Sequence, residues 1–184
     1  MAGLPRSYKV YTSGDGRKGT AVVINNDQLD VTLITQLSNQ DCVVVEVRSE
    51  AVKLHSVSMY FDSRKDIEED IRQLEKVRDY TKGNGLFIAV DSNARSKMWH
   101  DIVTNQRGEI LVEFIICKDL YVMNEATETP TFQSIRGSSR IDLTITNSKL
   151  VRFVSDWTCG EEESSSDHNI VNFKIASVNN GKGR

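Results

Sequence analysis

Short apolar runs separated by polar turns dominate the first third of the chain and predict a series of β-strands. Glycine, asparagine and aspartate, which are typical of turns, bound these runs. In the fourth run alternate positions become polar near its end, so we expect one face of that strand to be solvated. The connections are short, which favours antiparallel pairing of neighbouring strands. The predicted strands cover residues 8–11, 20–24, 31–35, 42–48 and 52–60.

Two later stretches repeat their apolar residues every three or four positions and therefore predict helices. In the first, apolar side chains run at helical spacing from Ile67 to Val77, with charged residues on the other face. We interpret the preceding Ser63–Asp66 as a capping box and expect the helix to end near Thr81. The second predicted helix spans Arg107–Cys117. Both are long enough to cover a sheet.

The remaining apolar runs return to strand patterns. A continuous run after a glycine turn, at residues 86–90, is typical of a strand buried on both faces. A hairpin is expected to begin near residue 130, to turn through residues 134–137 and to return along residues 140–146. Further strands are expected at residues 120–123, 150–157 and 170–175. Strands mixed with two helices indicate an α/β domain.

Length and composition favour one globular domain. The chain has 184 residues, of which 39% are hydrophobic and 27% charged. We expect the domain to occupy residues 1–177 and a polar tail to occupy residues 178–184. The three cysteines are widely spaced and odd in number, so they predict neither a disulfide framework nor a zinc site. No apolar run approaches the roughly 20 residues that span a bilayer, so we expect no membrane partner.

The net charge of −3 argues against binding nucleic acid through bulk positive charge. A polyanionic partner would have to be held at a local site, with the help of a bound cation. The glycine-rich Ser13–Thr20 superficially resembles a phosphate loop, but a strand pattern follows it where a P-loop needs a helix. We therefore interpret it as a hairpin turn, from which Arg17 and Lys18 are candidates to touch a phosphate backbone.

Polar residues stand where two of the predicted strands end. Asp91 and Asn93 follow the buried run, and two residues apart they would share one side of an extended chain. The mouth of such a strand is where α/β enzymes hold their ligands. Asp91 can align and deprotonate a water molecule, and Asn93 and Tyr60 can hydrogen-bond a phosphate. Taken singly, a polar turn and a tyrosine at the edge of the core are the plainer explanations.

Three further groups complete the components of metal-assisted phosphodiester hydrolysis. Asp167 can offer oxygen to a hard cation such as Mg²⁺. His168, oriented by a carboxylate such as Asp142, can present a protonated imidazole to a phosphoryl oxygen. Alone, Asp167 and His168 are more typical of a solvated serine-rich loop, and Asp142 of an edge strand.

The residue sequences of three motifs, and their order along the chain, decide between these explanations. Val90–Ala94, Ser139–Thr144 and Ser166–His168 resemble, in this order, three signatures of the exonuclease–endonuclease–phosphatase superfamily. Finer details resemble the endonuclease domain of non-LTR (LINE-type) retrotransposons, especially the site-specific insect elements. Those details are Asp91–His100, Asn105–Gly108, Thr129–Phe132 and Glu163–His168.

The resemblance implies a deoxyribonuclease-like fold, a four-layered α/β sandwich of two mostly antiparallel sheets flanked by helices. It also implies Mg²⁺-dependent nicking of double-stranded DNA at a retrotransposon target site, with Mn²⁺ as an alternative ion, to prime reverse transcription. A reverse transcriptase domain is expected downstream in the same polyprotein. Synthesis is expected in the cytoplasm and action in the nucleus.

The resemblance also assigns roles to single residues. It makes Asp91 the acid/base that activates water and Asp142 the partner that orients His168 on the scissile phosphate. Asn93 and Tyr60 become phosphate contacts, and Asp167 becomes a ligand of the metal or of its water. In the family the hairpin matching Phe132–Arg140 projects toward a DNA groove, so Arg136 at its tip is expected to contact DNA.

One departure from the family pattern concerns the start of the sequence. The family opens with a strand–helix–strand unit that carries an asparagine and the main metal-ligating glutamate. Ala2–Pro5 resembles the segment just after that glutamate, so the expectation is a domain truncated at its N-terminus. The alternative to an active endonuclease is then a catalytically inactive remnant that only binds DNA or a partner. A second alternative, within the same superfamily, is a phosphatase of small phosphorylated molecules.

Overall fold

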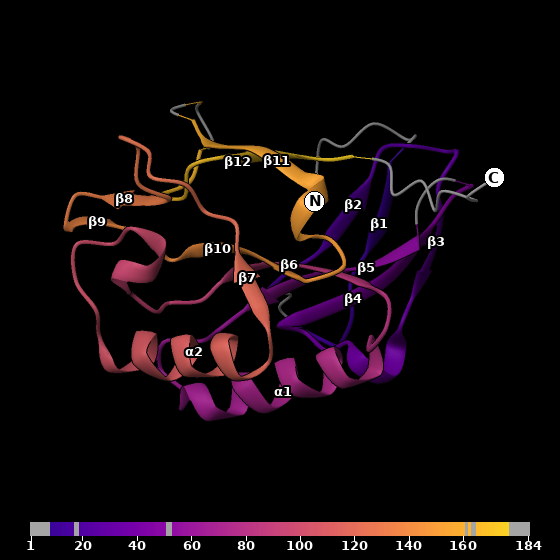
Figure 1. Ribbon diagram of the computed structural model, residues 1–184, viewed down its shortest axis with the longest axis horizontal. Coiled ribbons are helices and arrows are strands. Elements are labelled where there is room, and N and C mark those ends of the chain that lie inside the picture. Colours follow the sequence, from indigo (N-terminus) through magenta and orange to yellow (C-terminus); the bar gives the residue numbers. More distant parts are fainter. Residues whose placement is uncertain (1–7, 17–18, 51–52, 161, 163–164, 177–184) are drawn as a thin grey trace.

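A six-stranded mixed sheet forms the centre of the computed structural model, which describes residues 8–16, 19–50, 53–160, 162 and 165–176 (Figure 1). β5 and β6 pair in parallel, and every other pair in this sheet is antiparallel. The parallel pair requires a crossover, which the first helix provides. In spatial order the strands are β3 (Asp30–Leu33), β4 (Cys42–Arg48), β5 (Lys53–Tyr60), β6 (Gly85–Asp91), β10 (Asp142–Asn147) and β7 (Leu120–Val122).

Two helices, α1 (Ile67–Tyr80) and α2 (Gln106–Cys117), cover one face of the sheet (Figure 1). Alternate strand residues point toward them, because successive side chains of a strand face opposite ways. The resulting core is fully buried at its centre, where Leu74 of α1 and Leu111 of α2 are 0% exposed. Sheet residues of the same cluster include Val44, Val57, Ile88 and Ile145.

The opposite face of the sheet packs against two small two-stranded sheets. One pairs β1 (Lys9–Tyr11) with β2 (Val22–Ile24), and the other pairs β11 (Val154–Cys159) with β12 (Val171–Ile175). The rings of Phe87 and Phe173 lie 4.9 Å apart in this second core. Since β1 and β2 are joined as a hairpin, the interpretation of the glycine-rich segment as a hairpin turn is confirmed.

The remaining elements are short. A hairpin of β8 (Phe132–Ser134) and β9 (Gly137–Ser139) stands beside the main sheet and turns where the sequence predicted. The predicted return strand at residues 140–146 is wrong, because β10 leaves the hairpin and pairs with β6 and β7 in the main sheet. Three single turns of 3₁₀-helix lie at Thr35–Leu37, Lys97–Trp99 and Val151–Phe153.

Some predicted boundaries are wrong. The N-cap of α1 is Asp66, whose carboxylate accepts the amide of Glu68, so Ser63 does not open a capping box. The reason is a turn before the helix, in which Asp62 accepts the amide of Arg64 and delays the first helical residue. The strand predicted at residues 150–157 starts with a 3₁₀ turn and becomes extended only at residue 154.

The fold class is confirmed as an α/β sandwich of mostly antiparallel sheets flanked by helices. In the described residues the layers are a helical layer, the six-stranded sheet and the two small sheets. A second helical layer is not among them. No helix in the described ranges combines the length and apolarity needed to cross a membrane.

Candidate active site

Three of the predicted site residues form a row across three neighbouring strands. Asp91, the last residue of β6, pairs with Tyr60 of β5 on one side and with Asp142 of β10 on the other. Directly paired residues point to the same face of a sheet. That face is the one opposite the helices, because Val90 and Leu143 next to them point into the helical core.

His168 approaches this row from the loop before β12. Its Nδ1 lies 3.0 Å from both carboxylate oxygens of Asp142. Its Nε2 lies 3.8 Å from Oδ2 of Asp91. The predicted contact between Asp142 and His168 is therefore confirmed, and the imidazole stands between two carboxylates.

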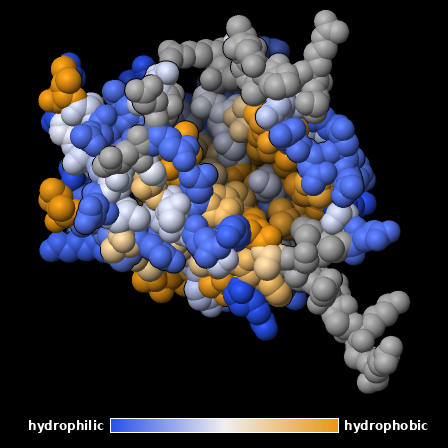
Figure 2. Space-filling model, turned by 90° about the horizontal axis from the view of Figure 1, so that it is seen from above, coloured by the Kyte–Doolittle hydropathy of each residue, from blue (hydrophilic) through white to orange (hydrophobic). Residues whose placement is uncertain are grey.

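A cavity of about 460 Å³ opens above the row. It lies between the main sheet and the two small sheets, and a recess is visible near the middle of this face in Figure 2. Small or polar side chains of the sheet form its floor, which leaves room for a ligand. They include Ser58, Ala89 and Thr144, with Tyr60, Asp91, Asp142 and His168 at the same opening.

The ionisable groups of the site perturb one another. Burial, reinforced by the neighbouring Asp142 carboxylate and opposed by His168, raises the pKa of Asp91 to about 6. The hydrogen bond to Asp142 raises the pKa of His168, against a smaller opposing effect of burial. Burial also raises the pKa of Tyr60, so its hydroxyl stays a donor. The site thus brings a carboxyl group and an imidazole together, and the pKa of each is raised by its surroundings.

Several supporting residues were not predicted. Thr131 is 1% exposed, and its hydroxyl accepts the amides of Ile141 at 3.0 Å and Asp142 at 3.1 Å. The side-chain amide of Asn124 donates to the carbonyl of Asp142 at 2.9 Å. The ring of Phe132 meets that of His168 edge-on, with 5.0 Å between centroids. The Thr129–Phe132 motif could have drawn attention to Thr131 and Phe132. Their partners in the site come from distant segments of the chain, so the sequence did not reveal the contacts.

Asn93 does not sit as expected. Its backbone is left-handed, with φ of 45°, so the chain after Asp91 is not extended and the two side chains do not share one side of a strand. The amide of Asn93 donates to Asp91 at 3.3 Å, and its side-chain nitrogen donates to the carbonyl of Phe61 at 3.0 Å. A local turn held by these bonds overrides the extended pattern.

The donor set of the site fits a divalent cation. Ligand atoms of Asp91, Asp142 and His168 all lie within 4.8 Å of one another. Carboxylate oxygens suit hard cations, and a bound cation would offset the cost of burying the charged form of Asp91. Asp167, predicted as the metal ligand, lies exposed in the loop before His168 and is not one of these three. Its metal role stays a prediction.

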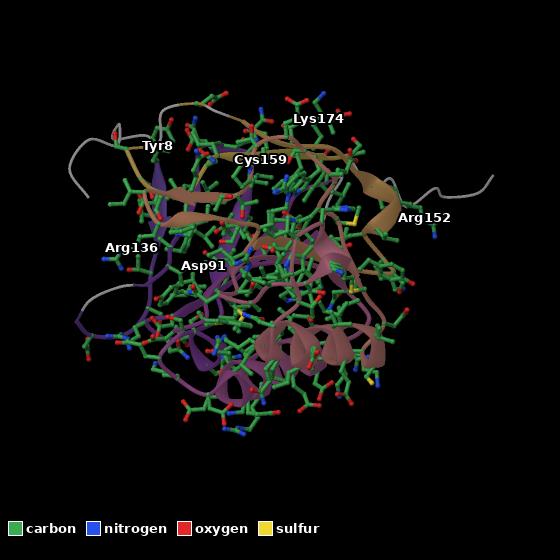
Figure 3. All side chains as sticks on the ribbon, turned by 90° about the vertical axis from the view of Figure 1, so that its left-hand side faces the viewer. Tyr8, Asp91, Arg136, Arg152, Cys159 and Lys174 are labelled. Carbon is green, nitrogen blue, oxygen red and sulfur yellow. The ribbon has the colours of Figure 1, made fainter. Side chains whose placement is uncertain are left out.

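The residues predicted to contact DNA lie further out. Arg136 is exposed at the tip of the β8–β9 hairpin, and in Figure 3 its side chain points away from the body of the molecule on the same side as Asp91. Arg17 and Lys18 lie outside the described residues. A second cavity of about 650 Å³ adjoins Tyr60 and is bordered by Arg64 and Lys65, two cations that were not predicted.

Comparison with known proteins gives the family. The sequence model of the family described as endonuclease–reverse transcriptase matches residues 54–172. The chain is 30% identical over 187 residues to a retrovirus-related Pol polyprotein from type-1 retrotransposable element R1 of Bradysia coprophila, covering 96% of this chain and 19% of that relative. It is 27% identical over 180 residues to a putative 115 kDa protein in element R1DM of Drosophila melanogaster, covering 91% and 17%. The chain thus spans about a fifth of the length of the curated relatives it matches.

Solved structures agree. The endonuclease domain of TRAS1, a telomere-specific non-LTR retrotransposon, superposes with a TM-score of 0.86 at 31% identity, over 92% of this chain and 80% of that one. The AP endonuclease LMAP from Leishmania major gives 0.69 at 11% identity, over 93% and 71%. The 3′–5′ exonuclease NExo from Neisseria meningitidis gives 0.66 at 16% identity, over 92% and 80%; these two show the fold alone. The chain belongs to the endonuclease–reverse transcriptase family, as a non-LTR retrotransposon endonuclease of the exonuclease–endonuclease–phosphatase superfamily.

Proposed function

We propose that this chain nicks one strand of double-stranded DNA in a reaction that requires Mg²⁺, with Mn²⁺ as an alternative ion. The observation that carries the proposal is the contact of His168 with Asp142 at 3.0 Å and with Asp91 at 3.8 Å, at the mouth of one cavity. Nucleases of this family are metal-dependent, and the same three groups form a candidate metal site.

Each residue of the row has a task in the proposal. Asp91, whose pKa lies at about 6, takes a proton from the attacking water. Asp142 holds Nδ1 of His168, so that Nε2 donates to a phosphoryl oxygen. The Tyr60 hydroxyl holds another phosphate oxygen as charge builds up on it. The Asn93 amide, whose nitrogen already donates to Phe61, would contact the phosphate only through its second N–H.

A divalent cation would be held by Asp91 and Asp142, with Asp167 as a further ligand of the ion or of its water. When bound, it stabilises negative charge on the phosphate and on the leaving oxygen, an effect worth several kcal/mol. The charge balance supports this assignment, because the site places two carboxylates beside one imidazole.

The relatives suggest the setting of the reaction. Because the Bradysia relative is a Pol polyprotein, we propose that the nick primes reverse transcription and that a reverse transcriptase domain follows in the same polyprotein. The substrate is then chromosomal DNA at the insertion site. The place of action is the nucleus, after synthesis in the cytoplasm.

Conversion of supercoiled plasmid to the open circle tests the proposal. We expect conversion with Mg²⁺ and none with EDTA. Asp91→Asn and His168→Asn should each lower the rate by a factor of about 10² to 10⁴, because the first removes the base and the second removes a hydrogen bond to the phosphoryl oxygen. Plasmid that stays supercoiled with either ion would support an inactive, DNA-binding remnant. Cleavage of a phosphomonoester but not of DNA would support a phosphatase.

A further inference from the structure

The Asn105–Gly108 motif opens α2 and touches the segment that follows Asp91. The side-chain oxygen of Asn105 accepts the amide of Gly108 at 2.8 Å and the amide of Arg95 at 3.1 Å. The amide of Asn105 donates to the carbonyl of Arg95 at 3.0 Å. One asparagine therefore caps the helix and fixes both backbone groups of Arg95.

Gly108 makes this close approach feasible. A Cβ added to it would lie 1.9 Å from the carbonyl oxygen of Arg95, well inside contact distance. The segment after Asp91 and the first turn of α2 are therefore packed backbone against backbone.

Arg107 extends the same arrangement to a second segment. Its Nε donates to the carbonyl of Asn93 at 3.1 Å, and its Nη2 to that of Ser92 at 3.5 Å. Its Nη1 donates to the carbonyl of Lys65 at 2.9 Å. Asp70 of α1 lies 3.8 Å from the same guanidinium, whose side chain is only 18% exposed.

The two segments joined by Arg107 continue from the two strands that carry site residues. β5 ends at Tyr60 and β6 at Asp91, and because these strands are parallel both segments leave the same edge of the sheet. Arg107 reaches the segment after each strand through backbone carbonyls. It is not among the residues that line the cavity.

We propose that Arg107 is a positioning residue, which holds the segments behind Tyr60 and Asp91 at a fixed separation and so sets the geometry of the site. The proposal rests on the proposed function for its effect on cleavage. Only a planar guanidinium presents several N–H donors in a rigid fork, and a lysine has one nitrogen for the same carbonyls. Asp70, with its Oδ2 3.8 Å from Nη2 of Arg107, adds an opposite charge beside the guanidinium.

Cleavage kinetics of Arg107→Lys and Arg107→Gly provide the first test. The assay follows the nicking of supercoiled plasmid in the presence of Mg²⁺. We expect kcat to fall about a hundredfold, the size of effect that displacement of a reacting group by about 1 Å produces. KM for DNA should stay within about twofold, because Arg107 does not bind the substrate. Added guanidinium ion should restore part of the kcat of Arg107→Gly and none of that of Arg107→Lys.

Arg78→Lys is the matched control. Arg78 also lies in a helix, is partly buried, pairs with an acid and donates to a backbone carbonyl, that of Lys118. Arg78 is remote from the active-site cavity, so the kcat of Arg78→Lys should equal that of the unchanged chain. An equal loss in both variants, or a rise in KM alone, would overturn the positioning role.

Amide hydrogen exchange gives a second readout that needs no activity. Residues 92–95 and 62–65 should exchange faster in Arg107→Lys, while amides of β4 keep their protection. If the unchanged chain fails to nick DNA, the proposed function fails and this exchange pattern still decides the role of Arg107. Unchanged exchange, or equally faster exchange throughout the core, would overturn the proposal.

Discussion

At the scale of single residues, two buried threonines differ in what their hydroxyl groups meet. The hydroxyl of Thr131 accepts two backbone amides, those of Ile141 and Asp142. The hydroxyl of Thr146 is buried without a hydrogen-bond partner among the described residues. Replacement by valine should therefore lower the stability of the fold at Thr131 but not at Thr146.

Thr131→Val should lower the free energy of unfolding by about 1–3 kcal/mol, because it leaves the amides of Ile141 and Asp142 without their acceptor. Thr146→Val should be neutral or slightly stabilising, since it removes a buried hydroxyl that has no partner. Urea unfolding of both variants measures the difference. If Thr131→Val is no less stable than Thr146→Val, the amides of Ile141 and Asp142 must find another acceptor when Thr131 is replaced.

The sequence allowed much of the site to be predicted at this scale, because its chemistry resides in three short motifs. Asp91, Asp142 and His168 lie where those motifs placed them, and the contact between the last two is confirmed. Thr131 and Asn124 escaped prediction because their partners are backbone groups. Those groups arrive only when distant strands pair, and no residue type marks them in advance.

At the scale of elements, the β8–β9 hairpin is fixed at its base and exposed at its tip. The buried carboxylate of Asp101 accepts the amide of Arg140 at 2.8 Å and pairs with Arg95. Beside the site, the amide of Gln133 donates to the carbonyl of Asp167 at 2.8 Å. The tip with Arg136 is thus carried on a rigid stem.

Arg136→Ala should weaken DNA binding and lower the slope of log K against log salt by about one, the change expected for one lost phosphate contact. Arg152→Ala is the control, because that arginine is also exposed but lies toward the opposite side of the molecule in Figure 3. Fluorescence anisotropy at several salt concentrations measures both. An identical slope for Arg136→Ala and the unchanged chain would remove Arg136 from the contact surface.

Element types were predicted more successfully than element ends. Helical spacing identified α1 and α2, and alternation or continuous apolar runs identified the long strands. The start of α1 was misplaced because Asp62 and Ser63 form a turn that competes for the same backbone groups. The parallel pairing of β5 with β6 depends on how α1 packs, which local patterns do not encode.

At the scale of the whole molecule, stability should depend on pH through His55. This residue is 2% exposed, and burial lowers its pKa below 6.5, while Glu46 opposes that change and Lys53 and Arg48 reinforce it. The unfolded chain therefore binds the proton more readily. The contribution of His55 is fully present above pH 6.5 and is lost as the pH falls through its folded pKa.

Replacing His55 with phenylalanine tests this dependence. The stability of the unchanged chain should fall more steeply from pH 7 to pH 5 than that of the variant. The reason is that the unchanged chain must protonate a buried imidazole in this range, whereas the phenylalanine variant has none. His168, whose pKa is raised, changes stability in the opposite direction in both proteins and cancels in the comparison. Parallel pH profiles in urea would show that His55 does not titrate on unfolding.

The row of Tyr60, Asp91 and Asp142 lies directly on the pairing register of three strands. A shift of one residue in any strand would turn its member toward the helices, so the sheet register decides which face each of these groups points to. The tip of the β8–β9 hairpin carries none of these groups and can therefore change in length and sequence at little cost to the chemistry. In such an architecture, new target preferences are expected to arise through loop divergence, while the cutting machinery is inherited intact.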